Sequence, residues 1–249
     1  MKTGQLALSL LCLVLMHSTV SAQPEATSAW HWGLHTGWQK YQEPAMQLEG
    51  PELGIQGYWR ASDSLKIEGR LTMARLDYNS PVSGRMSNIG QREASLIFLG
   101  PSWSMGSASI EPGLQWGITQ NDLRGRTSLG AMGYERDQDA TWAMLRWTQL
   151  LAHNESAWRQ VSLDVKGLLQ GRQRSHLSQA AANHQDVTNQ QTQGWGWALR
   201  GKIQLWNQDL EPYLQWQRIE TSDTVFDGVS YVKEPANKKL WIGLGWWPR

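Results

Sequence analysis

Ten segments of this 249-residue chain alternate large apolar side chains with small or polar ones, residue by residue. In the first segment, Trp30, Trp32 and Leu34 are separated by His31 and Gly33. This period of two predicts β-strands, because successive side chains of a strand point to opposite faces of its sheet. The segments lie at residues 30–38, 53–60, 65–73, 94–98, 110–118, 141–151, 161–170, 194–205, 210–216 and 240–246. The chain is therefore expected to be all-β.

The two faces of these strands have different compositions. One face carries Leu, Ile, Val and Trp, and the other mixes Gly with charged residues of both signs. In a soluble sandwich the apolar face forms the core, whereas in a membrane barrel it meets lipid and the polar face lines the lumen. Small residues mixed with charges favour a narrow, crowded lumen.

The lengths of the connections favour the membrane barrel. Short links are expected at 61–64, 100–107, 153–157 and 206–209, and long polar links at 42–52, 77–90, 119–139, 173–189 and 221–237. Outer-membrane barrels combine short periplasmic turns with longer extracellular loops, an even number of strands and periplasmic termini. The pattern predicts a transmembrane, antiparallel, up-and-down β-barrel of ten strands.

Tryptophan is unusually frequent and phenylalanine is rare. The chain has 16 Trp and 2 Phe, and Trp prefers the membrane–water interface because its ring is apolar while its N–H stays hydrated. The formal net charge of +1 gives no electrostatic reason to expect a nucleic-acid partner.

The N-terminus has the features of an export signal. Lys2 precedes an apolar run over residues 6–16, and small residues follow up to Ala22. The run is too short for a spanning helix, so residues 1–22 are predicted to be a signal peptide that is cleaved after Ala22. Residues 23–249 would then form the barrel in the cell outer membrane. The single cysteine, Cys12, lies in the predicted signal peptide, so disulfides are not expected.

Charged residues on the predicted inner face are the candidate site. A narrow lumen cannot leave its charges unpaired, because removing an ion from water costs several kcal/mol. We therefore expect a salt-bridge network that fills the lumen of a structural or interaction barrel; the alternative is a selectivity filter in a small-solute channel of porin type. The network would comprise Lys66, Glu68, Arg70, Glu93, Glu111, Arg146, Asp164, Lys166, Arg200, Lys202 and Glu211.

Catalysis at the loops is a further alternative. Ten-stranded surface proteases of the omptin type place acidic residues and a histidine there, and the loops of this chain contain Asp122, Asp137, Asp139, Asp186, Asp223, Asp227, His176 and His184. No spacing among these residues marks a catalytic dyad, so we expect that the protein is not an enzyme.

Metal and cofactor sites are not expected either. His31 and His35 stand four residues apart on a strand, which separates them by about 13 Å and suits lumen filling better than a shared metal. The chain also lacks a phosphate-binding glycine loop and a cysteine-based zinc motif.

Residues 170–196, with QGRQRSHLSQ and DVTNQQTQGWG, and residues 210–245, with LEPYLQWQRIETSD and YVKEPANKKLWIGLG, resemble uncharacterised proteobacterial outer-membrane β-barrel proteins of the broad porin and small-barrel class. The resemblance implies contact with outer-membrane lipid and lipopolysaccharide, and with the barrel-assembly machinery during biogenesis. Such proteins usually end on an aromatic residue, whereas Pro248 and Arg249 follow the last aromatic residues here. The long loops are candidate sites for an extracellular ligand.

Overall fold

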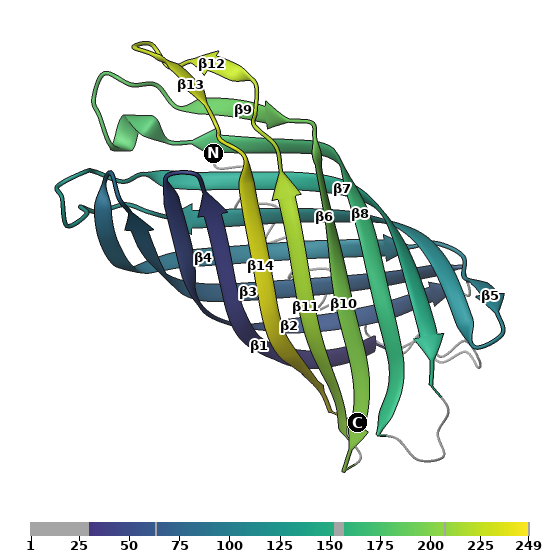
Figure 1. Ribbon diagram of the computed structural model, residues 1–249. Coiled ribbons are helices and arrows are strands. Elements are labelled where there is room, and N and C mark those ends of the chain that lie inside the picture. The colour runs from purple at the N-terminus through teal and green to yellow at the C-terminus, as the bar shows by residue number, and fades with distance from the viewer. Residues whose placement is uncertain (1–29, 63, 152–156, 207, 249) are drawn as a thin grey trace, which may run out of the picture.

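Ten long antiparallel strands close into a barrel in which each strand pairs with the next and the last pairs with the first (Figure 1). This computed structural model describes residues 30–62, 64–151, 157–206 and 208–248, so the predicted signal peptide and its cleavage site lie outside the described residues. The strands are β1 (Trp30–Glu43), β2 (Met46–Ser62), β3 (Leu65–Ser80), β4 (Gly84–Leu99), β6 (Ala108–Asp122), β7 (Glu135–Leu150), β8 (Trp158–Ser175), β10 (Gly194–Leu205), β11 (Gln208–Ile219) and β14 (Asn237–Trp247). The prediction of a ten-stranded up-and-down barrel is confirmed.

Short elements lie in the connections at both ends of the barrel. β5 (Trp103–Met105) folds back on the start of β6, and β9 (Val187–Gln191) pairs with the end of β8. β12 (Thr224–Phe226) and β13 (Tyr231–Lys233) form a separate hairpin between β11 and β14, and η1 (Leu177–Gln179) is a single 3₁₀ turn. Among the described residues no helix has the length and apolar character needed to span a membrane.

We call one end of the barrel the terminal end and the other the loop end. The terminal end holds the start of β1 and the end of β14, together with the β2–β3, β4–β6, β7–β8 and β10–β11 connections. The loop end holds the β1–β2 and β3–β4 turns and the β6–β7, β8–β10 and β11–β14 connections. In Figure 1 the hairpin of β12 and β13 rises above the loop end.

Apolar side chains cover the outer wall. On β1 the exposed outward residues run from Trp30 to Trp38, and the next outward residue is Lys40. Eight residues span about 26 Å along a strand, which is about 20 Å of barrel height at a strand tilt of about 40°. This height approaches the apolar band of about 25 Å that outer-membrane barrels present to lipid.

Two of the five predicted long loops are tight turns. Only Pro44 and Ala45 separate β1 from β2, and only residues 81–83 separate β3 from β4. The predicted loops 42–52 and 77–90 are therefore wrong, because these strands continue beyond the apolar band. Above the band the outward residues become polar, as at Glu49 and Asp77, so the hydrophobic alternation ends although the backbone ladder does not.

A β-bulge in β8 changes which residues of this strand point inward, so the sequence-based prediction for its second half is wrong. Thr141 pairs with Gln170 and Trp142 pairs with Leu168, so Leu169 is an extra residue. Leu168 is buried inside the barrel, whereas Leu169 and Gln170 are both exposed. The period of two over residues 161–170 predicts Gln170 on the inner face with Ser162 and Lys166. Gln170 is not there, because the extra residue reverses the phase of everything that follows it.

A charged residue on the lipid-facing wall should destabilise the barrel. Val165 is 53% exposed and lies between Leu145 of β7 and Trp197 of β10. We expect Val165→Arg to lower the free energy of unfolding by about 2–4 kcal/mol, because the guanidinium would enter hydrocarbon. The measurement is denaturant unfolding of the barrel in liposomes.

The matched control is Val82→Arg in the β3–β4 turn, where the side chain is 77% exposed and polar residues surround it. This variant should unfold like the wild type. Equal losses of stability in the two variants would contradict a lipid-facing wall at Val165.

Candidate functional site

A cluster of apolar side chains packs on one side of the interior at the loop end. Leu48, Leu76 and Ile89 are almost fully buried and pack in one cluster with Tyr41, Ala74 and Leu123. We call these six residues the seal. They come from β1 to β4 and from the start of the β6–β7 loop, so the seal joins one side of the barrel to this loop.

A buried ion cluster lies beside the seal. Arg136 Nη2 donates to Glu43 Oε1 at 2.7 Å and to Glu234 Oε2 at 2.9 Å. Tyr41 Oη donates to Glu43 at 2.6 Å, and Ser175 Oγ donates to Glu234 at 2.6 Å. Because Glu234 belongs to the β13–β14 connection, Arg136 ties this connection to the barrel wall.

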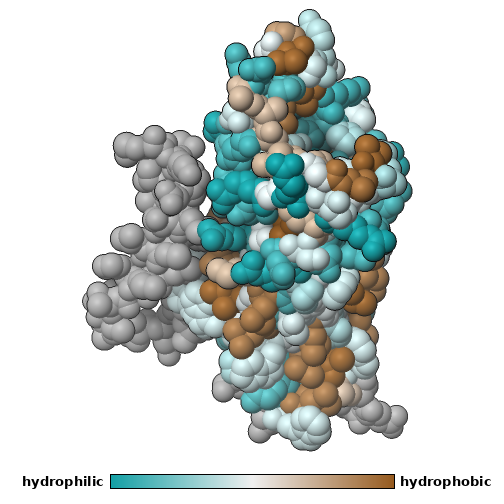
Figure 2. All heavy atoms as spheres, turned by 90° about the vertical axis from the view of Figure 1, so that its left-hand side faces the viewer, coloured by the Kyte–Doolittle hydropathy of each residue, from teal (hydrophilic) through white to brown (hydrophobic). Residues whose placement is uncertain are grey.

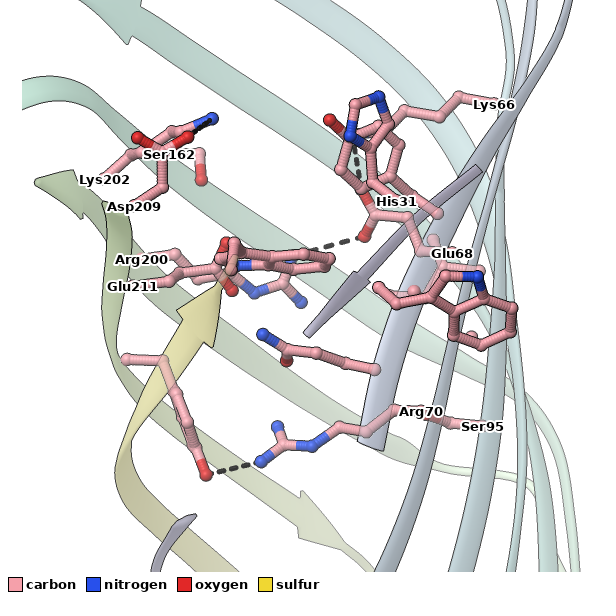
Figure 3. A pocket seen from close by; sticks show the side chains of 18 of the residues that line it. His31, Lys66, Glu68, Arg70, Ser95, Ser162, Arg200, Lys202, Asp209 and Glu211 are labelled. Carbon is pink, nitrogen blue, oxygen red and sulfur yellow. Dashed lines mark hydrogen bonds and ion pairs between the residues drawn. The ribbon is translucent and has the colours of Figure 1, made fainter. Parts of the chain in front are cut away.

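The interior towards the terminal end is hollow. A cavity of about 960 Å³, which we call the chamber, reaches Trp247 and Pro248 at the end of β14. Figure 3 shows charged side chains of opposite walls, among them Lys66, Arg70 and Glu211, pointing into it. His31 stacks on Tyr58 at a ring distance of 4.4 Å on the chamber wall.

Arg146 organises the charges beside the chamber. Its guanidinium donates to Glu68 at 2.6 and 3.0 Å and to Asp164 at 2.6 and 3.0 Å. Lys66 lies 2.8 Å from Glu68, and Arg200 lies 3.2 Å from Asp164. These five residues, which we call the central network, come from β3, β7, β8 and β10 and therefore link opposite walls. Two-pronged contacts of this kind are the strongest form of side-chain ion pair.

A second polar group lies closer to the loop end. Arg70 Nη2 donates to Glu52 Oε1 at 3.1 Å, and Tyr213 Oη donates to the same oxygen at 2.7 Å. Arg70 also lies over the Tyr213 ring and donates through Nε to His35 Nε2 at 3.0 Å. Thr72 Oγ1 lies 3.0 Å from that nitrogen. His35 thus acts here as a hydrogen-bond acceptor in the wall of the barrel.

The structure places all eleven predicted residues on the inner side of the wall. Lys66, Glu68, Arg70, Arg146, Arg200, Lys202 and Glu211 line the chamber, and Glu111 lines a second cavity of about 290 Å³. Asp164 belongs to the central network, Glu93 pairs with Lys239, and Lys166 donates to Gln115 and Gln217. Lys202 pairs with Asp209 at 2.9 Å. They form several groups rather than one network, and within the described residues no ion pair is found for Glu111 or Glu211.

Sequence reasoning missed several interior charges. Glu52, Arg136 and Lys239 are buried, and each lies at a strand position that had been assigned to a loop or left outside a strand. All three continue the inward phase of their strands, as Glu52 does with Gly54. Extending each alternation in phase, regardless of what the outer face carries, would have found them.

The loop histidines pair with carboxylates of loops and strand ends. Asp122, Asp137 and Asp139, which were expected in loops, lie on β6 and β7, because these strands continue beyond their apolar segments. The Nδ1 atom of His176 lies 2.8 Å from Asp186, and its Nε2 atom lies 3.2 Å from Asp137. His184 Nδ1 lies 2.6 Å from Asp227 Oδ2. Asp122 and Asp139 pair with arginines, and Asp223 accepts from the backbone of Gln190. Each carboxylate that had been considered for catalysis thus has a partner.

The loop end also exposes apolar side chains. Hydrophobic atoms lie at the top of the molecule in Figure 2, at the height of β12 and β13 in Figure 1, where Phe226 and Val229 are exposed. Within the described part of the chain, no group of three or more His, Cys, Asp or Glu residues could hold a metal ion.

No protein-family model matches the chain, and no curated protein matches it. Three solved structures are similar in fold. The outer membrane protease OmpT from Escherichia coli is 10% identical with a TM-score of 0.47, covering 90% of this chain and 99% of that one. The β domain of the Bordetella autotransporter BrkA is 14% identical with a TM-score of 0.44 (89% and 99% covered). The translocator domain of the autotransporter NalP from Neisseria meningitidis is 12% identical with a TM-score of 0.43 (98% and 94%). At these identities the likeness carries nothing about activity.

Arg146 should be a main determinant of stability. Its side chain is 5% exposed, and its removal leaves the buried carboxylate of Asp164 and the half-buried carboxylate of Glu68 with only Lys66 and Arg200 near them. We expect Arg146→Met to lower the free energy of unfolding by about 3 kcal/mol, at the lower end of the range for breaking a buried ion pair. The triple variant R146M/E68Q/D164N should recover part of this loss, because it also removes the carboxylates.

Denaturant unfolding in micelles, followed by tryptophan fluorescence, measures both variants. Arg172→Met is the control, since Arg172 is 54% exposed and its pair with Asp139 should contribute less than about 1 kcal/mol. If Arg146→Met unfolds together with this control, the central network does not hold the walls together.

The β12–β13 hairpin should loosen in acid. The backbone N–H of Ser230, then the contact with His184 and the N–H of Val229, hold the pKa of Asp227 well below its usual range. A carboxyl with a lowered pKa stabilises its fold above the unfolded-state pKa of about 3.9, and this stabilisation is lost as the pH falls further. We therefore expect the protection of residues 224–233 against hydrogen exchange, measured relative to the intrinsic rate at each pH, to fall below about pH 4.

Asp227→Asn should give fast exchange in the hairpin already at pH 7 and little further change in acid. Asp77→Asn, an exposed carboxyl on β3, is the control and should keep the wild-type profile. If the protection of the wild-type hairpin, measured relative to the intrinsic exchange rate, does not change with pH, this role of Asp227 is ruled out.

Proposed function

We propose that this protein is an integral outer-membrane β-barrel that is closed at its extracellular end and acts as a structural or interaction barrel. The apolar outer wall, about 20 Å high by strand geometry, and the polar interior support membrane insertion. The loop end is taken as extracellular and the terminal end as periplasmic, as is usual for such barrels.

We infer the closed state from one observation, the packing of the seal inside the loop end of the barrel. Leu48, Leu76 and Ile89 pack inside the barrel at the loop end, on the side of β1 to β4, and the buried Arg136 cluster ties a loop connection to the wall next to them. Ten strands enclose only slightly more space than eight, whose interior side chains fill completely. Water and ions would have to displace packed apolar groups to pass, so free diffusion through the barrel is not expected.

A second candidate is a gated channel for small solutes. The chamber of about 960 Å³ favours it, because the terminal half of the barrel is hollow and lined by charges. Conduction would require the seal and the Arg136 cluster to move together. The fixed, mutually paired charges of the central network would then select among solutes.

The proposal includes no enzymatic role. Asp137 and Asp186 occupy the two ring nitrogens of His176, so neither nitrogen is free to accept a proton from a substrate. Asp227 is engaged by two backbone N–H groups in addition to His184, a pattern that serves the turn between β12 and β13. Assay of the purified barrel against peptide libraries tests this point, and specific cleavage that His184→Ala abolishes would overturn it.

Planar-bilayer recording tests the closed state. Wild-type barrel should give no stable conductance steps after insertion, which is verified by faster gel migration before boiling than after. The variant L48A/L76A/R136A removes seal and ion-cluster side chains and should give flickering steps, because the lumen becomes continuous from chamber to loop end.

The matched control is L53A/L145A, which truncates exposed side chains on the outer wall and should stay silent. Stable steps from the wild-type barrel would reject the closed barrel in favour of the channel. Recovery of the mature chain in the soluble periplasmic fraction would instead reject membrane insertion itself.

A further inference from the structure

One wall of the chamber carries hydrogen-bonding groups that the protein itself does not satisfy. Gln56 is 7% exposed and lines the chamber, and within the described residues its Nε2 atom has no hydrogen-bond partner. Glu211 also lines the chamber, and the described part of the chain offers it neither an ion pair nor a hydrogen bond. Because an unpaired polar group inside a protein costs free energy, a ligand that pairs with both would be stabilised there.

The two side chains meet over Gly245 of β14. Glu211 lies directly opposite Gly245 in the strand register. A Cβ atom at Gly245 would lie 3.3 Å from the Cβ atom of Glu211 and would clash with the Nε2 atom of Gln56, which reaches this point from β2 across β1. The missing side chain at Gly245 therefore leaves a donor and an acceptor next to each other in the chamber wall.

The other charges of the chamber are largely balanced. Figure 3 shows Arg200 beside Glu211, and Arg200 is the cation that affects Glu211 most strongly. Its guanidinium is already engaged, at 3.2 Å from Asp164 and 3.5 Å from Glu68. Carboxylate partners are also present for Lys66, Arg70, Arg146 and Lys202. Arg60 is an exposed lining cation without an ion pair among the described residues, and its charge is opposite to that of Glu211. The lining therefore favours a neutral ligand with many hydrogen-bonding groups over an ion.

An aromatic surface adjoins the pair. Trp247 lies two residues from Gly245 on the same face of β14. Its ring lies against Gly33, because a Cβ atom there would come within 2.9 Å of the ring atoms Cδ2 and Cε3. Tyr58 is tilted against the same indole at a ring distance of 5.5 Å. Trp247 is half-buried and lines the chamber, so part of the indole is accessible to a ligand.

We propose that the chamber binds a short, neutral oligosaccharide that enters from the terminal end. A sugar hydroxyl is both a donor and an acceptor, so one such group can donate to the Glu211 carboxylate and accept from Gln56 Nε2. The apolar face of a sugar ring would pack on Trp247, since aromatic rings bury apolar surface.

The size of the chamber agrees with this class of ligand. Its volume of about 960 Å³ lies near the top of the range of about 300–1,000 Å³ for small-molecule sites, which leaves room for more than one sugar ring. The proposal rests on the proposed function, because it names the ligand of an interaction barrel that is closed at its loop end.

Saturation-transfer NMR of the folded barrel tests the site, in zwitterionic micelles whose detergent carries no sugar. The probes are the neutral trisaccharides maltotriose, cellotriose and chitotriose, with triglycine as a polar ligand that has no sugar ring. At least one trisaccharide should bind the wild type. Glu211→Gln should weaken its binding about tenfold, because a charge-assisted hydrogen bond becomes a neutral one. Gly245→Ala should weaken it by a similar factor, because the added methyl group displaces Gln56 from Glu211.

Glu111→Gln is the matched control. Glu111 is another interior carboxylate for which the described residues provide no ion pair, but it lines the second cavity instead of the chamber. This variant should bind the trisaccharide like the wild type.

Four results would overturn the proposal. The first is that none of the three trisaccharides binds the wild type, and the second is unchanged binding by Glu211→Gln or Gly245→Ala. The third is an equal loss in Glu111→Gln, which would show that binding does not depend on this pair. The fourth is binding of triglycine as strong as that of the best trisaccharide, which would assign the site to peptides.

Folding and closure are measured separately from binding. Gel migration before boiling is recorded first for every variant, so a chain that does not form the barrel is recognised. Planar-bilayer recording reports the closed state by itself, so a failure of the proposed function is distinguished from a failure of the oligosaccharide site.

Discussion

A sheet that faces lipid cannot leave its edge strands unpaired, because hydrocarbon offers no partners for backbone N–H and C=O groups. In this protein the constraint is met where β1 pairs with β14, over the register from Leu34–Trp246 to Gln42–Lys238. Closure fixes an inside and an outside for every strand. The apolar outer wall and the charged interior both follow from that single contact.

A barrel of only ten strands has a narrow interior. The side chains inside it must therefore fill the space and also pair their charges. At the loop end Leu48, Leu76 and Ile89 pack together beside the buried ion cluster of Arg136. Towards the terminal end the contacts are ionic, with Arg146 joining carboxylates of opposite walls. The chamber lies where neither group fills the barrel completely. A barrel that is packed at its loop end and hollow at its terminal end agrees with the proposed role in interaction rather than in free diffusion.

The sequence predicted the strands well wherever lipid contact imposes alternation. It located the inward phase of Arg146 within an ambiguous stretch, with Leu145 and Trp147 outside, and the structure agrees. It overlooked Glu52, Arg136 and Lys239, because each lies just beyond the end of a segment in which the alternation was recognised. It also failed at Gln170, since a bulge is a property of two paired strands and leaves no mark in the period of one.

The amino-acid sequence by itself determined the all-β class, the strand number and which charges turn inward, because a period of two fixes the side of each residue once one side must meet lipid. Only the tertiary structure decided which charges meet. Arg146 contacts Glu68, which is 78 residues away, and Arg70 contacts Tyr213, which is 143 residues away. Such partners depend on the register and closure of the sheet, which place residues of distant strands at the same height. The seal is likewise a consequence of closure, since its residues become a core only when the barrel brings them together.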